Sequence, residues 1–252
     1  MAHAKNMKIL TYNIHGGTGM DGVLDLSRIA AVIKSQHADF ICLNEVDVHC
    51  VRTGRIDTLA ELQRLLGIHG HFACALKMTA PRYPEQGDEI GEYGNAFFSP
   101  HAFEIVKEFM LPGLPEMEPR ICTVALIQAP QPFYAVATHF CWEPKYAEYR
   151  IASVQKIIEE TAGLASAQCP VILCGDLNAN PTEPEIELLR KLFLLYGETT
   201  GFLPTHPADN PTEIIDYICV APKRNFHFTN IEVIKETTAS DHRPLAAEIS
   251  AL

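Results

Sequence analysis

The stretch VILCGDLNANP, residues 171–181, runs from an apolar half into a polar half. Its apolar part, 171–174, is short and bounded by a glycine, as is typical of a strand buried in a core. Asp176 and Asn178 follow directly after Gly175, one residue apart. Either residue alone is typical of a turn or of a helix cap. Other expected strands end in polar residues in the same way, and a turn does not explain that recurrence.

Hydrophobic periodicity and turn residues predict the elements on either side of this stretch. The expected strands are 7–14, 38–47, 71–78, 93–99, 103–111, 120–129, 132–140, 170–176, 214–221, 226–236 and 244–250, and the expected helices are 24–36, 56–67, 144–163 and 183–194. Segment 81–92 lacks periodicity and is expected to be a polar loop. Strand–helix units flank an antiparallel middle, which predicts an α/β fold with two packed sheets covered by helices.

Length, composition and charge bound the possible functions. The chain has 252 residues, of which 47% are hydrophobic and 20% charged, as in ordinary globular proteins. No linker or repeat divides it, so residues 1–252 are expected to form one domain. The net charge of −11 gives no basic footprint for releasing counterions from phosphates. This balance argues against long duplex DNA as the partner.

Cysteine usage and hydropathy predict the compartment. The eight cysteines include no CxxC pair, which argues against a zinc site, and several lie in apolar runs. The apolar run near the N-terminus is too short for a signal peptide, and no segment approaches the roughly 18 apolar residues of a membrane span. We therefore expect a reduced, cytoplasmic protein without a membrane span.

Polar residues at the ends of expected strands are the candidates for a functional site. They are Asn13, Glu45, His139, Asp176 with Asn178, Asp216, and Asp241 with His242, while Arg120 begins another strand. Each residue alone has an ordinary explanation as a turn, a cap or a solvated strand end. Asp216 is the exception, because it lies among apolar residues where a charge needs a partner. It is improbable that the ordinary explanation holds for all of these residues at once.

The residue types in this set indicate the chemistry. Carboxylates and amide oxygens without a cysteine–histidine cluster suit Mg²⁺ or Mn²⁺ better than zinc. Two histidines beside carboxylates suit proton transfer. The sequence has no GxSxG elbow and no Walker A loop, and no GxGxxG motif directly follows an expected strand. Metal-assisted hydrolysis of a phosphate ester is the natural fit.

The ordered motifs together resemble a known superfamily. They are YNIHGG, LNEVD, YGNAFFS, ATHF, CGDLNANP, IDYICV and SDHRPL, between residues 12 and 245. This order is similar to that of the endonuclease/exonuclease/phosphatase superfamily, and the succession of GDLN, IDY and SDH is highly specific. The resemblance implies the DNase I-like fold, a four-layer α/β sandwich with two central mixed sheets flanked by helices.

The resemblance also implies roles for the metal and the attacking water. Glu45 resembles the main Mg²⁺ ligand, and Asn13 and Asp241 are expected to help hold the metal or its waters. Asp176 and Asn178 resemble the pair that positions the water and the scissile phosphate. Whether one or two metals act stays open.

Further roles concern the phosphate itself. His242 matches the histidine against the phosphate, and Asp216 the carboxylate that orients it. His139 matches an acid or phosphate ligand, with Asn95 as a candidate orienter. Arg120 resembles a phosphate-neutralising arginine of some branches. Which histidine is the acid and which is the base stays open.

Two departures from the family pattern concern the residues around these motifs. Asn44 precedes Glu45 where most members have Gln, which predicts an altered orientation of the glutamate. His15 and the segment 78–92 either define a branch-specific pocket or form a solvated loop, and the sequence leaves both interpretations open.

Three functions compete at this point. The leading hypothesis is a Mg²⁺-dependent phosphodiesterase or phosphomonoesterase acting on a small or single-stranded phosphorylated substrate. The first alternative is a Mg²⁺-dependent endonuclease or exonuclease on DNA or RNA. The second alternative is a non-catalytic binding module that retains the fold, and the intact set of candidate ligands argues against it.

Overall fold

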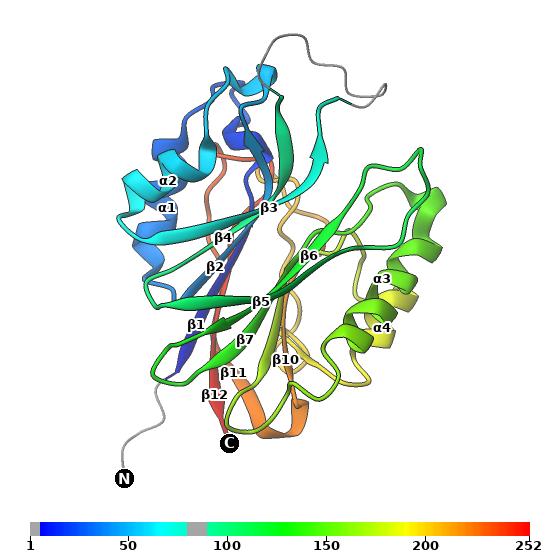
Figure 1. Cartoon of the computed structure of the whole chain (residues 1–252). Coiled ribbons are helices and arrows are strands. Elements are labelled where there is room, and N and C mark those ends of the chain that lie inside the picture. The colour runs from blue at the N-terminus through cyan, green and yellow to red at the C-terminus, as the bar shows by residue number, and fades with distance from the viewer. Residues whose placement is uncertain (1–5, 80–89) are drawn as a thin grey trace.

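A computed structural model describes residues 6–79 and 90–252, and its strands form two six-stranded sheets (Figure 1). The first sheet contains β1 (Met7–Asn13), β2 (Phe40–Val48), β3 (His69–Lys77), β4 (Glu92–Ser99), β11 (Phe226–Val233) and β12 (Leu245–Ala251). The second contains β5 (Phe103–Met110), β6 (Ile121–Ile127), β7 (Phe133–Thr138), β8 (Val171–Asp176), β9 (Leu194–Leu195) and β10 (Asp216–Ala221). Their orders are β11-β12-β1-β2-β4-β3 and β5-β6-β7-β8-β10-β9.

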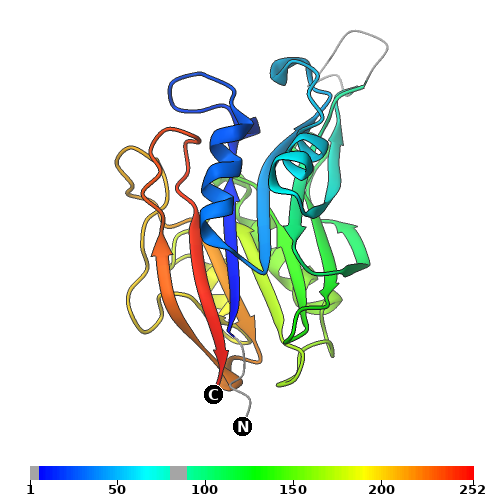
Figure 2. The same cartoon turned by 90° about the vertical axis from the view of Figure 1, so that its left-hand side faces the viewer.

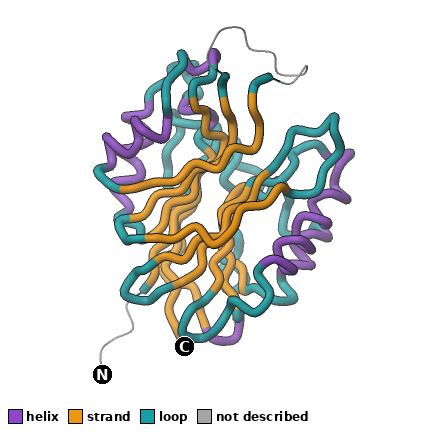
Figure 3. The backbone as a smooth tube through the Cα atoms, in the orientation of Figure 1, coloured by secondary structure: helices purple, strands orange, loops and turns teal. Residues whose placement is uncertain are grey.

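Helices cover the outer face of each sheet. They are α1 (Leu26–Gln36), α2 (Thr58–Leu66), α3 (Ala147–Glu160) and α4 (Pro184–Leu189). Helices α1 and α2 lie on the first sheet, and α3 and α4 lie on the second, so that the helices form the outer layers around the strands (Figure 3). The predicted four-layer α/β sandwich with two mixed sheets is therefore confirmed. No helix within the described residues is long and apolar enough to cross a membrane.

Two hydrophobic clusters hold the layers together. The larger fills the space between the sheets and under α3 and α4, and it includes Phe40, Phe133 and Val154. The smaller lies between the first sheet and its helices and includes Ile29 and Leu62. All six residues of β8 and of β10 are buried, because these strands lie inside the second sheet and have neighbours on both faces.

The predicted helix boundaries differ most from the observed ones in the two helices of the second sheet. The helix expected at 183–194 ends at Leu189, and Leu194 and Leu195 instead pair with β10 at the edge of the sheet. The helix expected at 144–163 begins with the 3-10 turn Pro144–Tyr146 before α3 and ends at Glu160. The polar loop expected at 81–92 lies largely outside the described residues.

Each sheet contains one parallel strand pair joined by a helix. Strands β1 and β2 are parallel and connected through α1, and β7 and β8 are parallel and connected through α3. Both pairs run toward the same end of the molecule, opposite the end where the C-terminus lies (Figure 2). Ligand sites of α/β sheets lie at the carboxyl ends of parallel strands, so this arrangement brings four such ends together.

The buried side chain of Asn44 joins the two sheets at this end. Its Nδ2 donates to Oδ1 of Asn95 at 2.9 Å and to the carbonyl oxygen of Thr138 at 2.8 Å. Its Oδ1 accepts the backbone N–H of Asp176 at 2.8 Å. One amide from the first sheet thus holds the ends of β7 and β8 in the second.

Removing this amide should destabilise the fold. Asn44→Ala leaves the N–H of Asp176 and the carbonyl of Thr138 buried without their partner, so the free energy of unfolding should fall by about 3 kcal/mol. Urea unfolding measures this change. The matched control is Asn6→Ala, which removes exposed hydrogen bonds to Glu248 and from Ser250 and should alter stability by less than about 0.5 kcal/mol. Equal effects of the two substitutions would contradict the role of Asn44.

Candidate active site

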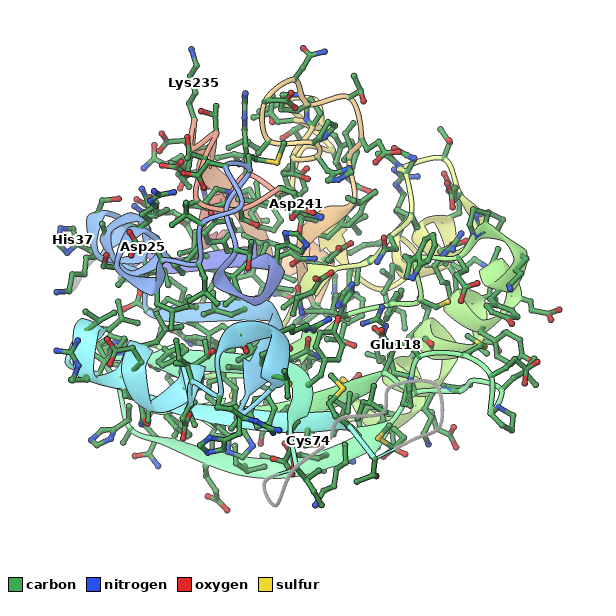
Figure 4. All side chains as sticks on the ribbon, turned by 90° about the horizontal axis from the view of Figure 1, so that it is seen from above. Asp25, His37, Cys74, Glu118, Lys235 and Asp241 are labelled. Atoms are coloured by element: carbon green, nitrogen blue, oxygen red, sulfur yellow. The ribbon has the colours of Figure 1, made fainter. Side chains whose placement is uncertain are left out.

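A cavity of about 600 Å³ opens at the joined strand ends, and most of the predicted site residues line it. The cavity is lined by Glu45, His139, Asp176, Asn178, Asp241 and His242, together with His15, Trp142, Pro144, Arg150, Asn180, Glu183, His206, Glu213 and Ile215. From above, Asp241 lies near the middle of this face and Lys235 points outward at its edge (Figure 4).

Glu45 reaches the cavity from a bulge in β2. The pairing of β2 with β4 shifts register between Leu43 and Val46, and Glu45 has a φ of 57°. A non-glycine residue in this left-handed region costs on the order of 1 kcal/mol, and such strain is common at functional sites. The bulge interrupts the alternation of faces and thereby directs Glu45 toward the site. Asn44 points to the second sheet, so it does not orient the glutamate by direct contact.

Asn13, the last residue of β1, links carboxylates of the two sheets. Its Nδ2 donates to Oε1 of Glu45 at 3.0 Å and to Oδ2 of Asp176 at 3.1 Å. Its Oδ1 accepts the backbone N–H of His15 at 3.1 Å. In this arrangement Asn13 positions the two carboxylates with its N–H groups, whereas direct metal binding needs its oxygen.

Gly175 allows β8 to approach β7 closely. Its φ is 143°, and an added Cβ would lie 1.9 Å from the carbonyl oxygen of Thr138. No side chain fits there without displacing backbone. The glycine is therefore required by the strand contact that carries Asp176 to the cavity.

His242 and Asp216 form a buried pair. Nδ1 of His242 donates to Oδ2 of Asp216 at 2.8 Å, and the same oxygen accepts the hydroxyl of Thr205 at 2.6 Å. Burial opposes the charged imidazole, but the carboxylates of Asp216, Asp176 and Asp241 outweigh it and raise the pKa of His242 to about 10. The structure thus gives Asp216 the partner that its sequence context requires, and His242 is a cation at neutral pH.

Asp176 is a buried carboxyl group whose pKa is shifted toward neutrality. It lies opposite Asp216 in the antiparallel pairing of β8 with β10. Burial and the charge of Asp216 raise the pKa of Asp176 to about 7. Its Oδ1 accepts the N–H of Asn178 at 2.9 Å, and Asn178 has a φ of 49°. A carboxylate with such a pKa suits proton transfer at physiological pH.

His139 is the second imidazole of the cavity. Its Nδ1 lies 3.0 Å from Nη1 of Arg120, and since a guanidinium only donates, Nδ1 accepts and Nε2 carries the proton. Burial and the charges of Arg120 and His242 lower the pKa of His139 well below its usual value. Its Nε2–H faces Oδ2 of Asp176 at 3.5 Å. Nδ2 of Asn178 lies 3.1 Å from Nε2, but it is also a donor, and it donates to the carbonyl oxygen of Phe140 instead. His139 is therefore a neutral hydrogen-bond donor.

Arg120 and Asn95 lie behind the cavity rather than in its lining. Arg120 is buried behind His139, where Nη1 contacts Glu118 and the hydroxyl of Tyr93, and it does not line the cavity. Its expected role in neutralising the phosphate stays a prediction, and in the structure its Nη1 donates to Nδ1 of His139 and thereby fixes the tautomer of that imidazole. Asn95 donates to the carbonyl of Ile121 and accepts from Asn44, so its expected contact with His139 is replaced by that of Arg120.

Asp241 is held at the cavity by the loop before β12. The hydroxyl of Ser240 donates to the carbonyl oxygen of Asn13 at 2.7 Å and lies 3.2 Å from Oδ1 of Asp241. Among the described residues, two groups bring three potential metal-binding atoms within 4.8 Å: Asp176, Asp216 and His242 form one, and His206, Asp241 and His242 form the other. Glu45 belongs to neither group.

Several cavity residues were not among the candidates from the sequence, and three of them stand out. Trp142, His206 and Glu213 come from loops outside the motifs. The ring of His206 lies against that of His242, with 4.7 Å between centroids and 41° between the ring planes, and its Nδ1 lies 2.7 Å from Oε2 of Glu213. No periodicity marks such positions, although the Trp, as the only one in the chain, was a visible signal.

The donors in the cavity fit a hard cation. Glu45 and Asp241 present carboxylates, and Asp176 adds a third. Apart from histidines, Arg150 is the only basic residue among the described residues of the lining, and its guanidinium is bound by Glu183 and Glu185. Several carboxylate oxygens around one cavity, with the His242 imidazolium as the only cation of the described lining not already paired with glutamates, suit Mg²⁺ or Mn²⁺.

Comparison with known proteins defines the class. The family model described as "Endonuclease/Exonuclease/phosphatase family" matches residues 10–242, and the chain belongs to this family of phosphoester hydrolases and nucleases. A search of curated proteins found no match.

Solved structures share the fold at low sequence identity. An endonuclease/exonuclease/phosphatase from Beutenbergia cavernae DSM 12333 is 22% identical with a TM-score of 0.76, covering 98% of this chain and 72% of its own. A family protein from Bacteroides thetaiotaomicron is 19% identical with a TM-score of 0.75, covering 98% of both chains. The mannosyl-6-phosphatase Bt3783 of Bacteroides thetaiotaomicron VPI-5482 is 19% identical with a TM-score of 0.73, covering 96% of this chain and 99% of its own.

The shifted pKa of Asp176 predicts how stability depends on pH. The folded state binds this proton more tightly than the unfolded chain, so ionisation of Asp176 lowers the free energy of unfolding as pH rises from about 4 to about 7. Asp176→Asn cannot ionise. In EDTA, its stability relative to the parent should rise by about 2 kcal/mol between about pH 5 and about pH 8. Urea unfolding checks this, and parallel pH curves would contradict it.

Proposed function

We propose that this protein is a divalent-cation-dependent phosphoester hydrolase in which Asp176 activates water. The observation that carries the proposal is the position of Asp176 between two imidazoles of different protonation. Oδ2 of Asp176 lies 3.5 Å from Nε2 of the neutral His139 and 3.7 Å from Nε2 of the cationic His242. Such a trio offers a base, a neutral donor and a cation to one phosphoryl group.

The reaction assigned to this trio is an in-line displacement at phosphorus. Asp176 takes a proton from water as the water oxygen forms its bond to phosphorus. The bond from phosphorus to the leaving oxygen breaks, and the His242 imidazolium supplies the proton that this oxygen takes. Nε2–H of His139 and the amide of Asn178 hold phosphoryl oxygens. Asp216 fixes the orientation of His242 through Nδ1.

A divalent cation would be held by Glu45 and Asp241. When bound, Mg²⁺ or Mn²⁺ neutralises charge that develops on the phosphoryl oxygens. Nδ2 of Asn13 donates to both Glu45 and Asp176 and thereby holds the two carboxylates in fixed relative positions. The ionic identity is part of the proposal and rests on the oxygen-rich donor set.

The substrate is proposed to be a small or single-stranded phosphorylated molecule. The net charge of −11 disfavours duplex DNA, and the fold neighbour named as a mannosyl-6-phosphatase supports action on phosphomonoesters. A cytoplasmic location also belongs to this proposal, since all eight cysteines are free.

A screen of phosphoesters with Mg²⁺ and Mn²⁺ tests the function. It should include phosphomonoesters, bis-p-nitrophenyl phosphate, plasmid DNA and single-stranded oligonucleotides. His242→Ala should lower hydrolysis by about 100-fold or more. The matched control is His101→Ala, which removes another histidine–aspartate pair, with Asp39, away from the cavity. Cleavage of plasmid DNA alone would favour a nuclease, and cation binding without any hydrolysis would favour a binding module.

The proposed metal ligand has its own test. Glu45→Gln keeps the side-chain shape but removes the charge, so the Mg²⁺ concentration for half-maximal activity should rise by about 10-fold or more. Metal titrations of initial rates measure this. Glu61→Gln, on the exposed surface of α2, serves as the control and should leave the titration unchanged. An unchanged midpoint for Glu45→Gln would remove Glu45 from the metal site.

A further inference from the structure

An exposed tryptophan stands at the mouth of the proposed catalytic cavity. Trp142 follows His139 by three residues and lines the same cavity. Its side chain is 59% exposed, although large aromatic residues usually bury most of their surface. The proposed chemistry does not use it. An exposed aromatic face beside a site is well suited to stack on a ring of the ligand.

The charges around Trp142 restrict the class of ligand whose ring can stack on it. Arg150 donates to Glu183 at 3.0 Å, to Glu185 and to the carbonyl of Cys141 at 3.3 Å, so its charge is already neutralised. No lysine and no second arginine is present among the described residues of the cavity lining. A ligand with further phosphates would therefore face carboxylates without cationic partners, which disfavours a nucleic-acid strand.

The same cavity offers acceptors for hydroxyl groups. Glu183, Glu213 and the amide of Asn180 line the cavity together with Trp142. Carboxylate and amide oxygens accept hydrogen bonds from hydroxyls, and the aromatic face covers the apolar side of a ring. A flat apolar surface beside acceptors matches a sugar, which has C–H groups on its faces and hydroxyls at its edge.

We propose that Trp142 is the stacking platform for the leaving group and that the substrates are phosphomonoesters of sugars. This inference rests on the proposed hydrolase function and names its substrate class. Water displaces the sugar hydroxyl at phosphorus, so the products are the free sugar and inorganic phosphate. Trp142 contacts the leaving group only, and its loss should raise KM more than it lowers kcat.

Kinetics on two matched substrates test the platform. With glucose 6-phosphate, Trp142→Ala should lower kcat/KM by about 10-fold, chiefly through KM, and Trp142→Phe should recover most of it. With glycerol 3-phosphate, which has no ring, the variant should retain the parent rate within about twofold. Leu192→Ala removes a side chain that is 48% exposed and outside the cavity lining, and it should change neither substrate.

The single tryptophan also permits a test that does not need turnover. In the Asp176→Asn variant with Mg²⁺, glucose 6-phosphate should quench or shift the fluorescence of Trp142, and glycerol 3-phosphate should leave it unchanged. Absence of any fluorescence response to glucose 6-phosphate would overturn the inference. So would an equal loss of activity on both substrates, or a higher kcat/KM for adenosine monophosphate or an oligonucleotide than for the sugar phosphate.

The two levels of the proposal fail in different ways. A fluorescence response to glucose 6-phosphate without hydrolysis of any phosphoester by the parent protein contradicts the proposed function and supports the sugar-binding platform. Hydrolysis of glucose 6-phosphate that is unaffected by Trp142→Ala supports the proposed function and overturns the platform.

Discussion

The buried amide of Asn44 is the constraint on which the site depends. It comes from the first sheet, yet its three hydrogen bonds extend to Asn95 in its own sheet and to Thr138 and Asp176 in the second. Within each sheet alone, the parallel strand pair ends in only a few polar side chains. Because the amide fixes the two sets of strand ends against each other, Glu45 and Asp176 come close enough for Asn13 to bind both.

Repulsion between two buried carboxylates is the second feature of this region. Asp176 and Asp216 face each other in buried strands, and the protein resolves the repulsion by holding His242 charged and by raising the pKa of Asp176 to about 7. Arg120 keeps His139 neutral from the other side. Burial thus sets neighbouring groups at different protonation states, as proton transfer to and from a phosphate ester requires.

Sequence reasoning predicted the fold class and six of the fifteen residues that line the cavity, because strand periodicity and the ordered motifs are local signals. It did not predict features that depend on packing. The bulge that turns Glu45 inward, the position of Arg120 behind His139 and the short helix α4 all follow from contacts between distant segments. Trp142 was missed because a loop residue carries no periodicity. That residues 1–252 form a single domain stays a prediction.

The central claim is that water, activated at the joined strand ends, attacks phosphorus directly. Hydrolysis of a phosphomonoester in oxygen-18 water with Mg²⁺ tests it most directly, by mass spectrometry of both products after a single turnover. The account predicts one solvent oxygen in the released inorganic phosphate and none in the alcohol. Solvent oxygen in the alcohol, with none in the phosphate, would show cleavage of the carbon–oxygen bond and contradict the account.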